Sequence, residues 1–561
     1  NVLRLVAEGP MYHCENHAET TLVGNRRIWD GREYEISFRA RWIAGSPQLH
    51  TRLTWNRLPR TTILDMPTQH GTPGARNSRY QPNIGPTFAG LQHAPIVPDE
   101  GQLVTVRVHA TDPNGVAACR LWWSVDEAAW FSTSMSASNA WYSGTLPGAG
   151  AGQIVNFYVE GVDGLGATSC YPRTGRAGGA LYIVQDNQVS PLPVHNVRVI
   201  MRPSDFAAML AKANRTSDAY LPGTIVYDEA TAYYDVGVRL KGRSSRRNES
   251  TGFRISFKAD RLFRGVHAGV AIDRSGRWMG RFGGIDFNKS QEEILVKHIA
   301  NRAGHIPSQY DDLIKVISQD ASYSQSALLL MGRYARPYLQ SLFDDDGDGS
   351  LYNFELVYYS TTTLGGGVEG LKDASQGAAL QGFLIIDVED LGLDQEYYRM
   401  HFQQQNARDR DDYSRIVDMA RAFSLTQAQA AAVIGDIIDE DAWMRLFAFH
   451  SLIGIFDTYN FGGNHNMYFY VRPKDRRVLP FPVDMDWAFD HQVRATNAAL
   501  YGGYNLQKII TLPRNLRRLY GHFLDIMARS YNMPYMGSWC TNYFALTEGY
   551  PARASCFTSN L

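Results

Sequence analysis

The stretch DTYNFGGNHNMYFYVRPKDRRVLPFPVDMDWAFD, residues 457–490, decides how the last part of this chain folds. Two apolar runs flank the turn-forming RPKDRR, and this pattern predicts a β-hairpin. Asp457 comes directly after a long apolar helix that precedes the hairpin. Four more polar residues stand at the open end of the hairpin, where its strands begin and end: Asn464, Asn466, Asp484 and Asp486. The sequence therefore predicts that these five side chains lie close together.

Carboxylate and amide oxygens are the ligands that Mg²⁺ and Mn²⁺ prefer. Phosphoryl transfer needs an Asp near the nucleophile, an Asn, and an Asp that holds the metal on the phosphates. The order of residues here is similar to that of protein kinases, although the HRD and DFG motifs are absent. The alternative is that the five residues are only helix caps and turn residues, which is the usual role of Asp and Asn.

Several segments between about residues 195 and 545 resemble the CotH kinase family, which is named for a spore-coat protein kinase. They occur in the family's order: VGVRLKGRSSRR, FRISF with LFRG, EEILVKHIANRAGHIPSQY, and NHNMYFYVRP with FPVDMDWAF. Family members have a divergent protein-kinase-like fold and transfer phosphate from ATP to protein Ser residues. The resemblance therefore implies an atypical protein kinase, with ATP and Mg²⁺ or Mn²⁺ as cofactors.

The resemblance also assigns roles to the residues of the hairpin. Asp457 falls where the family has its catalytic Asp. Asp484 and Asp486 fall on the two acids of its PWDxD motif, of which at least one binds metal. Asn464 and Asn466 fall in the stretch that faces the metal and the phosphates.

The nucleotide-binding residues that the resemblance implies lie earlier in the chain. Arg254 stands at the basic position of the family's SFKxxF strand, where a kinase normally has Lys, and Lys241 or Lys258 is an alternative. Glu293 is the carboxylate partner expected for that base on the next helix. A basic turn at 242–247 takes the place of a Gly-rich loop, and its hydroxyls can reach phosphates. These hydroxyls belong to Ser244 and Ser245. The alternative for each residue is a solvated charge or a plain turn.

A second acidic motif, DDDGDGSLYNFE at 344–355, fits the spacing of an EF-hand calcium loop. Five residues would supply oxygen ligands to Ca²⁺: Asp344, Asp346, Asp348, the carbonyl of Ser350 and Glu355. The apolar LVYY that follows is typical of a strand rather than of an exiting helix. We therefore expect an isolated structural Ca²⁺ loop, and the alternative is a solvated acidic turn.

Turn spacing and periodicity predict a multidomain chain with an all-β front and a mixed α and β end. Residues 1–70 are expected to form a β-sandwich-like segment, because REYEISFRARWIA alternates apolar and polar residues. A Gly- and Pro-rich linker follows at 71–83, and an immunoglobulin- or fibronectin-like β-sandwich at 84–190. Residues 191–561 are expected to form an α+β domain, and the resemblance implies that it is kinase-like.

Composition excludes several classes of function. The 561 residues carry a formal net charge of −1, so a nucleic-acid partner is not expected. No apolar run reaches the ~20 residues that span a bilayer. The five cysteines include no CxxC motif. Cys119 could pair with Cys170 and Cys540 with Cys556 in an oxidising compartment, with Cys14 left over, or all five could be reduced thiols.

Two functions follow from these patterns. The favoured one is phosphorylation of Ser or Thr on a protein substrate, with ATP as donor, by a secreted, extracellular or cell-surface enzyme. The start at Asn1 favours export. The alternative is a non-catalytic, calcium-stabilised adhesion or assembly protein of the surface, built on a kinase-like scaffold, whose partner would be another surface protein.

Overall fold

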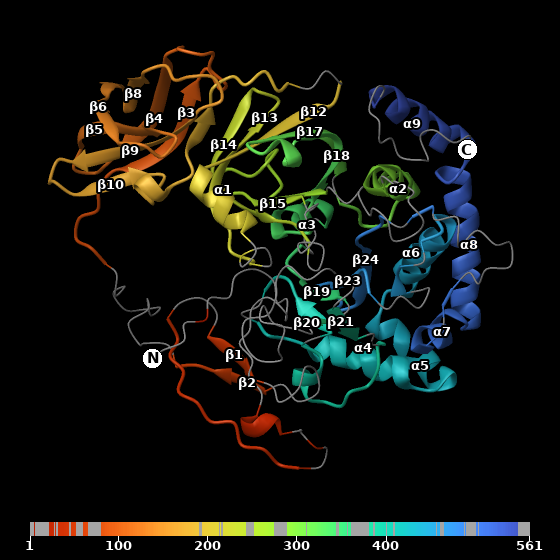
Figure 1. Ribbon diagram of the computed structural model, residues 1–561. Coiled ribbons are helices and arrows are strands. Elements are labelled where there is room, and N and C mark those ends of the chain that lie inside the picture. The colour runs from red at the N-terminus through yellow and green to blue at the C-terminus, as the bar shows by residue number, and fades with distance from the viewer. Residues whose placement is uncertain are drawn as a thin grey trace.

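The computed structural model in Figure 1 describes most of the chain. The described residues are 5, 22–26, 29, 32–43, 47–51, 60–65, 80–189, 193–211, 214, 217–242, 252–273, 289–309, 311–343, 347–355, 357–360, 381–384, 387–399, 401–407, 410–455, 457–459, 465–486, 488–489, 501–502 and 504–547. A β-rich front precedes a part in which helices and strands mix, and this order confirms the predicted fold class at its coarse level.

In the first part of the chain, the described residues contain less regular structure than the pattern predicts. A short 3₁₀ turn, η1 (Val23–Asn25), precedes two paired strands, β1 (Gln48–Thr51) and β2 (Arg60–Ile63). Residues 32–43 form no strand, so the strand expected from their alternation is wrong. Most of their side chains are exposed. Alternation alone does not make a strand where the described residues provide neither a partner strand nor a buried face.

A four-stranded and a five-stranded antiparallel sheet form the β-sandwich that follows. The first sheet has the order β3-β4-β8-β7, and the second has the order β10-β9-β5-β6 with β11 on β9. The bounds are β3 (Thr87–Ala94), β4 (Val104–Thr111), β5 (Val116–Val125), β6 (Phe131–Ser134), β7 (Ser136–Ser138), β8 (Trp141–Leu146), β9 (Ile154–Asp163), β10 (Thr168–Tyr171), the 3₁₀ turn η2 (Gly175–Ala177) and β11 (Leu181–Ile183). Strand β4 alternates buried and exposed side chains, because one face meets the core.

The strand register separates the two cysteines of the sandwich. Cys119 lies opposite Gly161 of β9, and Cys170 lies opposite Glu160, the neighbouring residue. Adjacent residues of a strand point to opposite faces, so the two thiols lie on different sides of the sheet. Both are free, and the pairing of Cys119 with Cys170 is therefore wrong. Cys14 and Cys556 lie outside the described residues.

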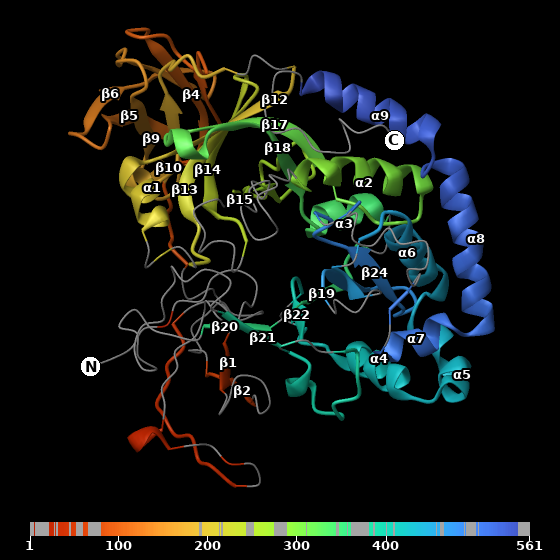
Figure 2. The same ribbon diagram turned by 45° about the vertical axis from the view of Figure 1, so that its right-hand side comes forward.

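A closed seven-stranded barrel follows the sandwich. Its strand order is β12-β13-β14-β15-β16-β18-β17, and the parallel pairing of β12 with β17 closes it. The bounds are β12 (His195–Met201), α1 (Pro203–Leu210), β13 (Leu221–Tyr227), β14 (Thr231–Leu240), β15 (Phe253–Ser256), β16 (Gly269–Asp273), α2 (Lys289–Ala303), β17 (Asp311–Ser318), the 3₁₀ turn η5 (Ala321–Tyr323) and β18 (Gln325–Gly332). Apolar side chains fill the barrel, and α2 packs against β17 and β18 from outside. Figure 2 shows the sandwich beside one end of the barrel and α2 beside the other.

Among the described residues, a further four-stranded sheet and seven α-helices make up the C-terminal part. The sheet has the order β22-β19-β23-β24, and β20 pairs separately with β21. The bounds are α3 (Arg336–Leu342), β19 (Ser350–Phe354), β20 (Val357–Ser360), β21 (Gln381–Leu384), the 3₁₀ turn η7 (Gln395–Tyr397), β22 (Phe402–Gln404), α4 (Ser414–Ser424), α5 (Gln427–Ile437), α6 (Glu440–Leu452), β23 (Met467–Val471), β24 (Val478–Pro482), α7 (Tyr504–Ile510), α8 (Pro513–Arg529) and α9 (Met533–Leu546). The predicted hairpin is β23 and β24.

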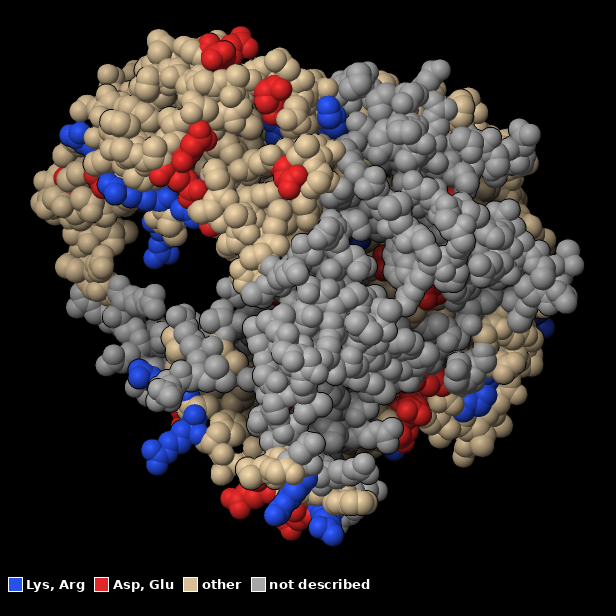
Figure 3. Space-filling view, viewed as in Figure 1, with Lys and Arg blue, Asp and Glu red and all other residues tan. Residues whose placement is uncertain are grey.

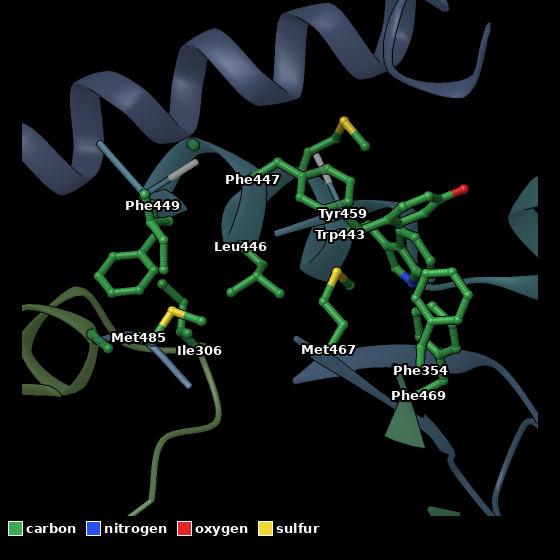
Figure 4. Close-up of a cluster of buried hydrophobic side chains, with 14 of the residues drawn as sticks. Ile306, Phe354, Trp443, Leu446, Phe447, Phe449, Tyr459, Met467, Phe469 and Met485 are labelled. Atoms are coloured by element: carbon green, nitrogen blue, oxygen red, sulfur yellow. The ribbon is translucent and has the colours of Figure 1, made fainter. Parts of the chain in front are cut away.

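Helix α6 is buried on nearly all sides because sheet and helices enclose it. It packs against β24 on one side and α8 on another. Trp443 stacks on Phe469 of β23 and donates its indole N–H to the carbonyl of Val478, at 2.9 Å. Figure 4 shows these two rings beside Phe354 of β19 in the main core. The packing fixes the hairpin against α6, so the end of α6 and the open end of the hairpin have fixed relative positions.

The sequence predicts Ser204 as a helix N-cap and Ser424 with Gln427 as a capping box, and both predictions are wrong. The capping box of α5 is formed by Thr426 and Gln429, whereas Ser424 is still the last residue of α4. Helix α1 begins at Pro203, and the hydroxyl of Ser204 bonds to Glu127 of the sandwich instead of capping the helix. Among the described helices, none combines the length and the apolar character needed to cross a membrane.

Candidate functional site at the joint of barrel and hairpin

The candidate site lies where one end of the barrel meets the open end of the hairpin. Lys241 directly follows β14, and Asp273 is the last residue of β16. The ammonium of Lys241 forms an ion pair with the carboxylate of Asp273. Helix α2 adds Glu293 from the outer face of the barrel. The barrel therefore contributes one cation and two carboxylates to this joint.

The hairpin side of the joint is organised by Asp457. The side-chain amide of Asn466 donates to the backbone carbonyl of Asp457 at 2.9 Å. The imidazole Nε2 of His465 lies 3.1 Å from a carboxylate oxygen of the same residue. The end of α6 and the start of β23 are thus held together. Both Asn466 and Asp484 have φ of 57°, a left-handed conformation that Asn and Asp adopt more readily than most residues.

Glu293 connects the two sides. Its carboxylate accepts the backbone N–H of Met485 at 3.0 Å, and Met485 stands between Asp484 and Asp486. Glu293 is fully buried, and its second oxygen has no hydrogen-bond partner among the described residues. Helix α2 therefore fixes the backbone of the acidic loop after β24.

Negative charge exceeds positive charge at this joint. Seven carboxylates influence one another's ionisation there: Asp273, Glu293, Asp311, Glu355, Asp457, Asp484 and Asp486. The cations at this joint are Lys241 and Lys297, and His465 becomes a third when it is protonated. On the face seen in Figure 3, by contrast, acidic and basic side chains are interspersed over the described part of the surface.

The pKa values reflect this imbalance. Burial, and then the nearby Asp311, Asp484 and Asp273, raise the pKa of Glu293 to about 8, although Lys297 opposes this. The pKa of Asp486 is raised by burial and by the neighbouring carboxylates, Asp484 first. The side chain of Asp484 is exposed at the surface, but protein surrounds it closely. Loss of hydration and the nearby Asp273 raise the pKa of Asp484, although Lys241 lowers it.

The pKa values of Lys241 and His465 are raised as well, which favours the charged form of each group. Burial lowers the pKa of Lys241, but Asp273, Asp484 and Glu293 outweigh it, so the net shift is upward. The hydrogen bond that His465 donates to the carboxylate of Asp457, with Glu355 nearby, raises the pKa of His465 in spite of burial. The positively charged forms of Lys241 and His465 are therefore favoured at the joint.

This donor set fits divalent cations. In their present arrangement, no three His, Cys, Asp or Glu side chains of the described residues stand close enough to chelate an ion. However, carboxylates with raised pKa values and a surplus of negative charge are the environment that a hard dication stabilises. Asp457, Asp484 and Asp486 are the carboxylates that the hairpin brings to this place.

Not all of the predicted nucleotide-binding residues reach the joint. Arg254 lies opposite Arg239 in the barrel, and both arginines help to lower the pKa of Tyr220 after Arg333. Lys258 is exposed and pairs with Asp235 at 3.0 Å. Lys241, named as an alternative, is the base that meets the acidic loop. Ser244, Ser245 and Asn464 lie outside the described residues.

The calcium motif is spread along a strand. Ser350 opens β19, whose five residues are extended, and Glu355 follows its far end. Five extended residues span about 16 Å, whereas an EF-hand folds these positions around one ion. Asp348 pairs with Arg336 at 2.7 Å, and Glu355 instead influences His465 and Asp484 at the joint. Asp344 and Asp346 lie outside the described residues.

Asp311 was not predicted from the sequence, and neither were three other residues of the site. Asp273 ends a strand in GVAID, His465 stands between two predicted Asn residues, and Lys297 follows Glu293 by one helical turn. The motif HN, which carries the family resemblance, contained the signal for His465. Nothing local marks Asp273, because only the barrel register brings it to Lys241.

Comparisons with known proteins agree with this picture in one respect. No curated protein matches the chain. A solved structure titled "Crystal structure of Br derivative BhCBM56" is similar at 13% identity, covering 16% of this chain and 88% of that one, with a TM-score of 0.12. The family model described as "CotH kinase protein" matches residues 330–516, which include Asp457, Asp484 and Asp486. Residues 330–516, a third of this chain, are therefore similar to the CotH kinase family.

Proposed function

We propose that this protein transfers phosphate from ATP to Ser or Thr of a protein substrate, at the joint between the barrel and the hairpin. The observation that carries the proposal is the convergence there of Lys241 and Glu293 with Asp457, Asp484 and Asp486. Phosphoryl transfer needs few parts: a base, a metal-binding carboxylate, and a cation for the phosphates. The match to the CotH kinase family supports the same reading.

Each residue has a role in this proposal. Asp457 would accept the proton of the substrate hydroxyl, and its pairing with His465 and Asn466 fixes its orientation. Asp484 and Asp486, with Asn466, would hold Mg²⁺ or Mn²⁺. A bound dication would neutralise charge on the phosphates and on the transferred group. The sequence motif also places Asn464 in this set.

Lys241 is the base that we favour for contact with the phosphates. Its ammonium is already held by Asp273 and feels Asp484 and Glu293. Glu293 would act through the backbone of Met485, which it anchors, rather than as a direct partner of Arg254. The barrel and the C-terminal part would then correspond to the two lobes of a kinase-like fold, with the joint as the nucleotide cleft.

The substrate and the cellular place of the reaction are part of the proposal. The family's association with spore coats supports a protein substrate at a surface, and the β-sandwich would then serve as a spacer or docking module. No described helix can span a membrane, which is compatible with this setting.

The test is incorporation of phosphate from labelled ATP, with Mg²⁺ or Mn²⁺, into the protein itself and into a Ser-rich peptide. The inactive control carries Asp457→Ala together with Asp484→Ala. A matched control carries Asp418→Ala, which removes an exposed acid of α4 far from the joint in sequence. Label in the native protein and the Asp418 variant but not in the double variant supports the proposal. No label in any of them, and no effect of ATP on thermal unfolding, would leave a non-catalytic scaffold.

A further inference from the structure

A cavity of about 240 Å³ lies on the face of α2 next to Glu293. Helix α2 lines it with one side, and the chain before β17, helix α3 and the barrel contribute the rest. The lining residues are His267, Ile294, Lys297, His298, Asn301, Ser308, Gln309, Asp311 and Tyr338. A water molecule occupies about 30 Å³ of liquid, so the cavity offers the space of roughly eight waters.

Two opposite charges face this cavity without hydrogen bonds. The Nζ of Lys297 lies 3.7 Å from Asp311 and 3.9 Å from Glu293, distances too long for hydrogen bonds. Lys297 is 4% exposed and Asp311 is 1% exposed. Among the described residues, neither the ammonium nor either oxygen of Asp311 has a hydrogen-bond partner. A buried charge without such partners is costly, so a ligand that supplies them gains affinity.

The remaining lining groups add hydrogen-bonding capacity but little charge. Burial lowers the pKa of both His267 and His298 to about 4, so both imidazoles are neutral near pH 7. His298 is further fixed by its stacking on Trp539 and its hydrogen bond to Tyr543. Asn301 and Gln309 contribute amides, and Ser308 is bonded to Asn301. Lys297 is therefore the cation among the described lining residues, and Asp311 balances it.

We propose that this cavity binds a small zwitterion of the size of a free amino acid. The ligand's carboxylate would pair with Lys297, and its ammonium would pair with Asp311. A phosphate or a nucleotide fits less well, because one lysine beside a carboxylate leaves no net positive charge to receive it. An apolar ligand would leave both buried charges without partners.

The cavity shares Lys297 with the candidate site. The oxygen of Glu293 that lies 3.9 Å from Lys297 is the same one that accepts the N–H of Met485. A ligand that pairs with Lys297 would therefore change the interaction of Lys297 with Glu293, and through Glu293 it would affect the acidic loop. Binding itself does not depend on the proposed kinase activity.

Isothermal titration of the full chain with L-serine tests the proposal. N-acetyl-L-serine, which lacks the ammonium, and L-serinamide, which lacks the carboxylate, are the matched ligands. We expect saturable binding of L-serine and at least about tenfold weaker binding of each derivative, since each loses one charged hydrogen-bond partner. L-Glutamine and L-alanine extend the probe set to larger and smaller side chains.

Two variants locate the site. Asp311→Asn keeps the shape of the side chain, and it should weaken L-serine binding about tenfold while L-serinamide and L-serine become similar in affinity. Arg302→Ala changes an exposed residue of α2 that does not line the cavity and should bind like the native chain. Thermal unfolding of each variant checks that it is folded. The proposal is overturned if no amino acid of the set binds the folded native chain, or if Asp311→Asn binds L-serine unchanged.

Discussion

Around His93, the joint between the barrel and the β-sandwich is built from neutral and aromatic side chains, whereas the joint between the barrel and the C-terminal part is built from charged ones. In the first joint, His93 accepts from the hydroxyl of Tyr234 at 2.6 Å and donates to the carbonyl of Ile96 at 2.9 Å. Tyr182 stacks on the same imidazole. Every polar atom of His93 that faces this joint has a partner.

The second joint has unbalanced charge instead. Glu293 and Asp486 are crowded by other carboxylates, and their pKa values are raised. Such an arrangement costs stability unless a cation is present, and costly polar clusters of this kind are common at functional sites. The comparison suggests that the sandwich joint serves stability and the hairpin joint serves function. The following predictions test that division, beginning with the largest effect.

Replacing Asp457 by Asn should abolish most of the phosphate transfer while leaving the fold intact. The amide cannot accept a proton, and positioned acid–base groups typically contribute about 10²–10⁴-fold to a rate. Labelled phosphate incorporation measures the loss, and a urea unfolding curve checks stability. Equal activity of this variant and the native chain would remove Asp457 from the mechanism.

The sandwich joint should lose stability in acid because of His93. Burial lowers the pKa of His93 to about 4 in the folded state, from 6.5 in the unfolded state. The neutral form is therefore favoured by folding, so its contribution is complete above pH 6.5 and is lost as pH falls toward 4. The loss amounts to at most about 3 kcal/mol. Urea unfolding of the native chain and of His93→Gln between pH 7 and pH 4 should show the stability difference shrinking in acid.

The same His93→Gln variant should keep its phosphate transfer at pH 7, because the barrel separates the sandwich joint from the acidic loop after β24 (Figure 2). If the variant loses activity while it remains folded, the division between a stabilising joint and a functional joint does not hold.

Lys241 and Arg254 provide a sharper comparison within the hairpin joint. Lys241→Met should weaken ATP binding by about ten- to a hundredfold, since a charge-assisted contact to phosphate is worth roughly 1.5–3 kcal/mol. Arg254→Met should have a smaller effect, because Arg254 lies beside Arg239 and Tyr220. Calorimetric titration with ATP and Mg²⁺ separates the two. The reverse order of effects would restore Arg254 as the phosphate-binding residue.

The smallest expected effect is a gain in stability. Asp486→Asn removes one of the mutually repelling carboxylates, so the metal-free protein should become more stable by about 1 kcal/mol near pH 7. Urea unfolding in the presence of EDTA measures this gain, and phosphate transfer should fall at the same time. A loss of stability would show that Asp486 has a favourable partner in the folded chain.

Much of the hairpin joint could be predicted from local sequence. The apolar runs around RPKDRR fixed the hairpin, and polar residues at its ends had to come together. The family resemblance added the roles. Helix caps were predicted two residues too early at α5, because Ser424 and Thr426 are both good N-caps and only packing decides between them.

The rest depends on contacts between distant residues. Barrel closure by β12 and β17 joins strands more than a hundred residues apart, and no local pattern encodes it. That closure and the strand register bring Lys241 to Asp273 and leave Arg254 opposite Arg239. The described part of the calcium motif lies along a strand for the converse reason: its spacing is that of a loop, but Leu351 and Tyr352 are core residues of a strand.

We propose that a divalent cation, bound together with a nucleotide, neutralises the surplus negative charge of the hairpin joint. Calorimetric titration of ATP into the native chain, with Mg²⁺ and then with EDTA, tests it most directly, alongside Asp484→Asn and His93→Gln. We predict saturable binding only with Mg²⁺, lost in Asp484→Asn and kept in His93→Gln. Absence of binding to the native chain, or equal binding with EDTA and in Asp484→Asn, would contradict the claim.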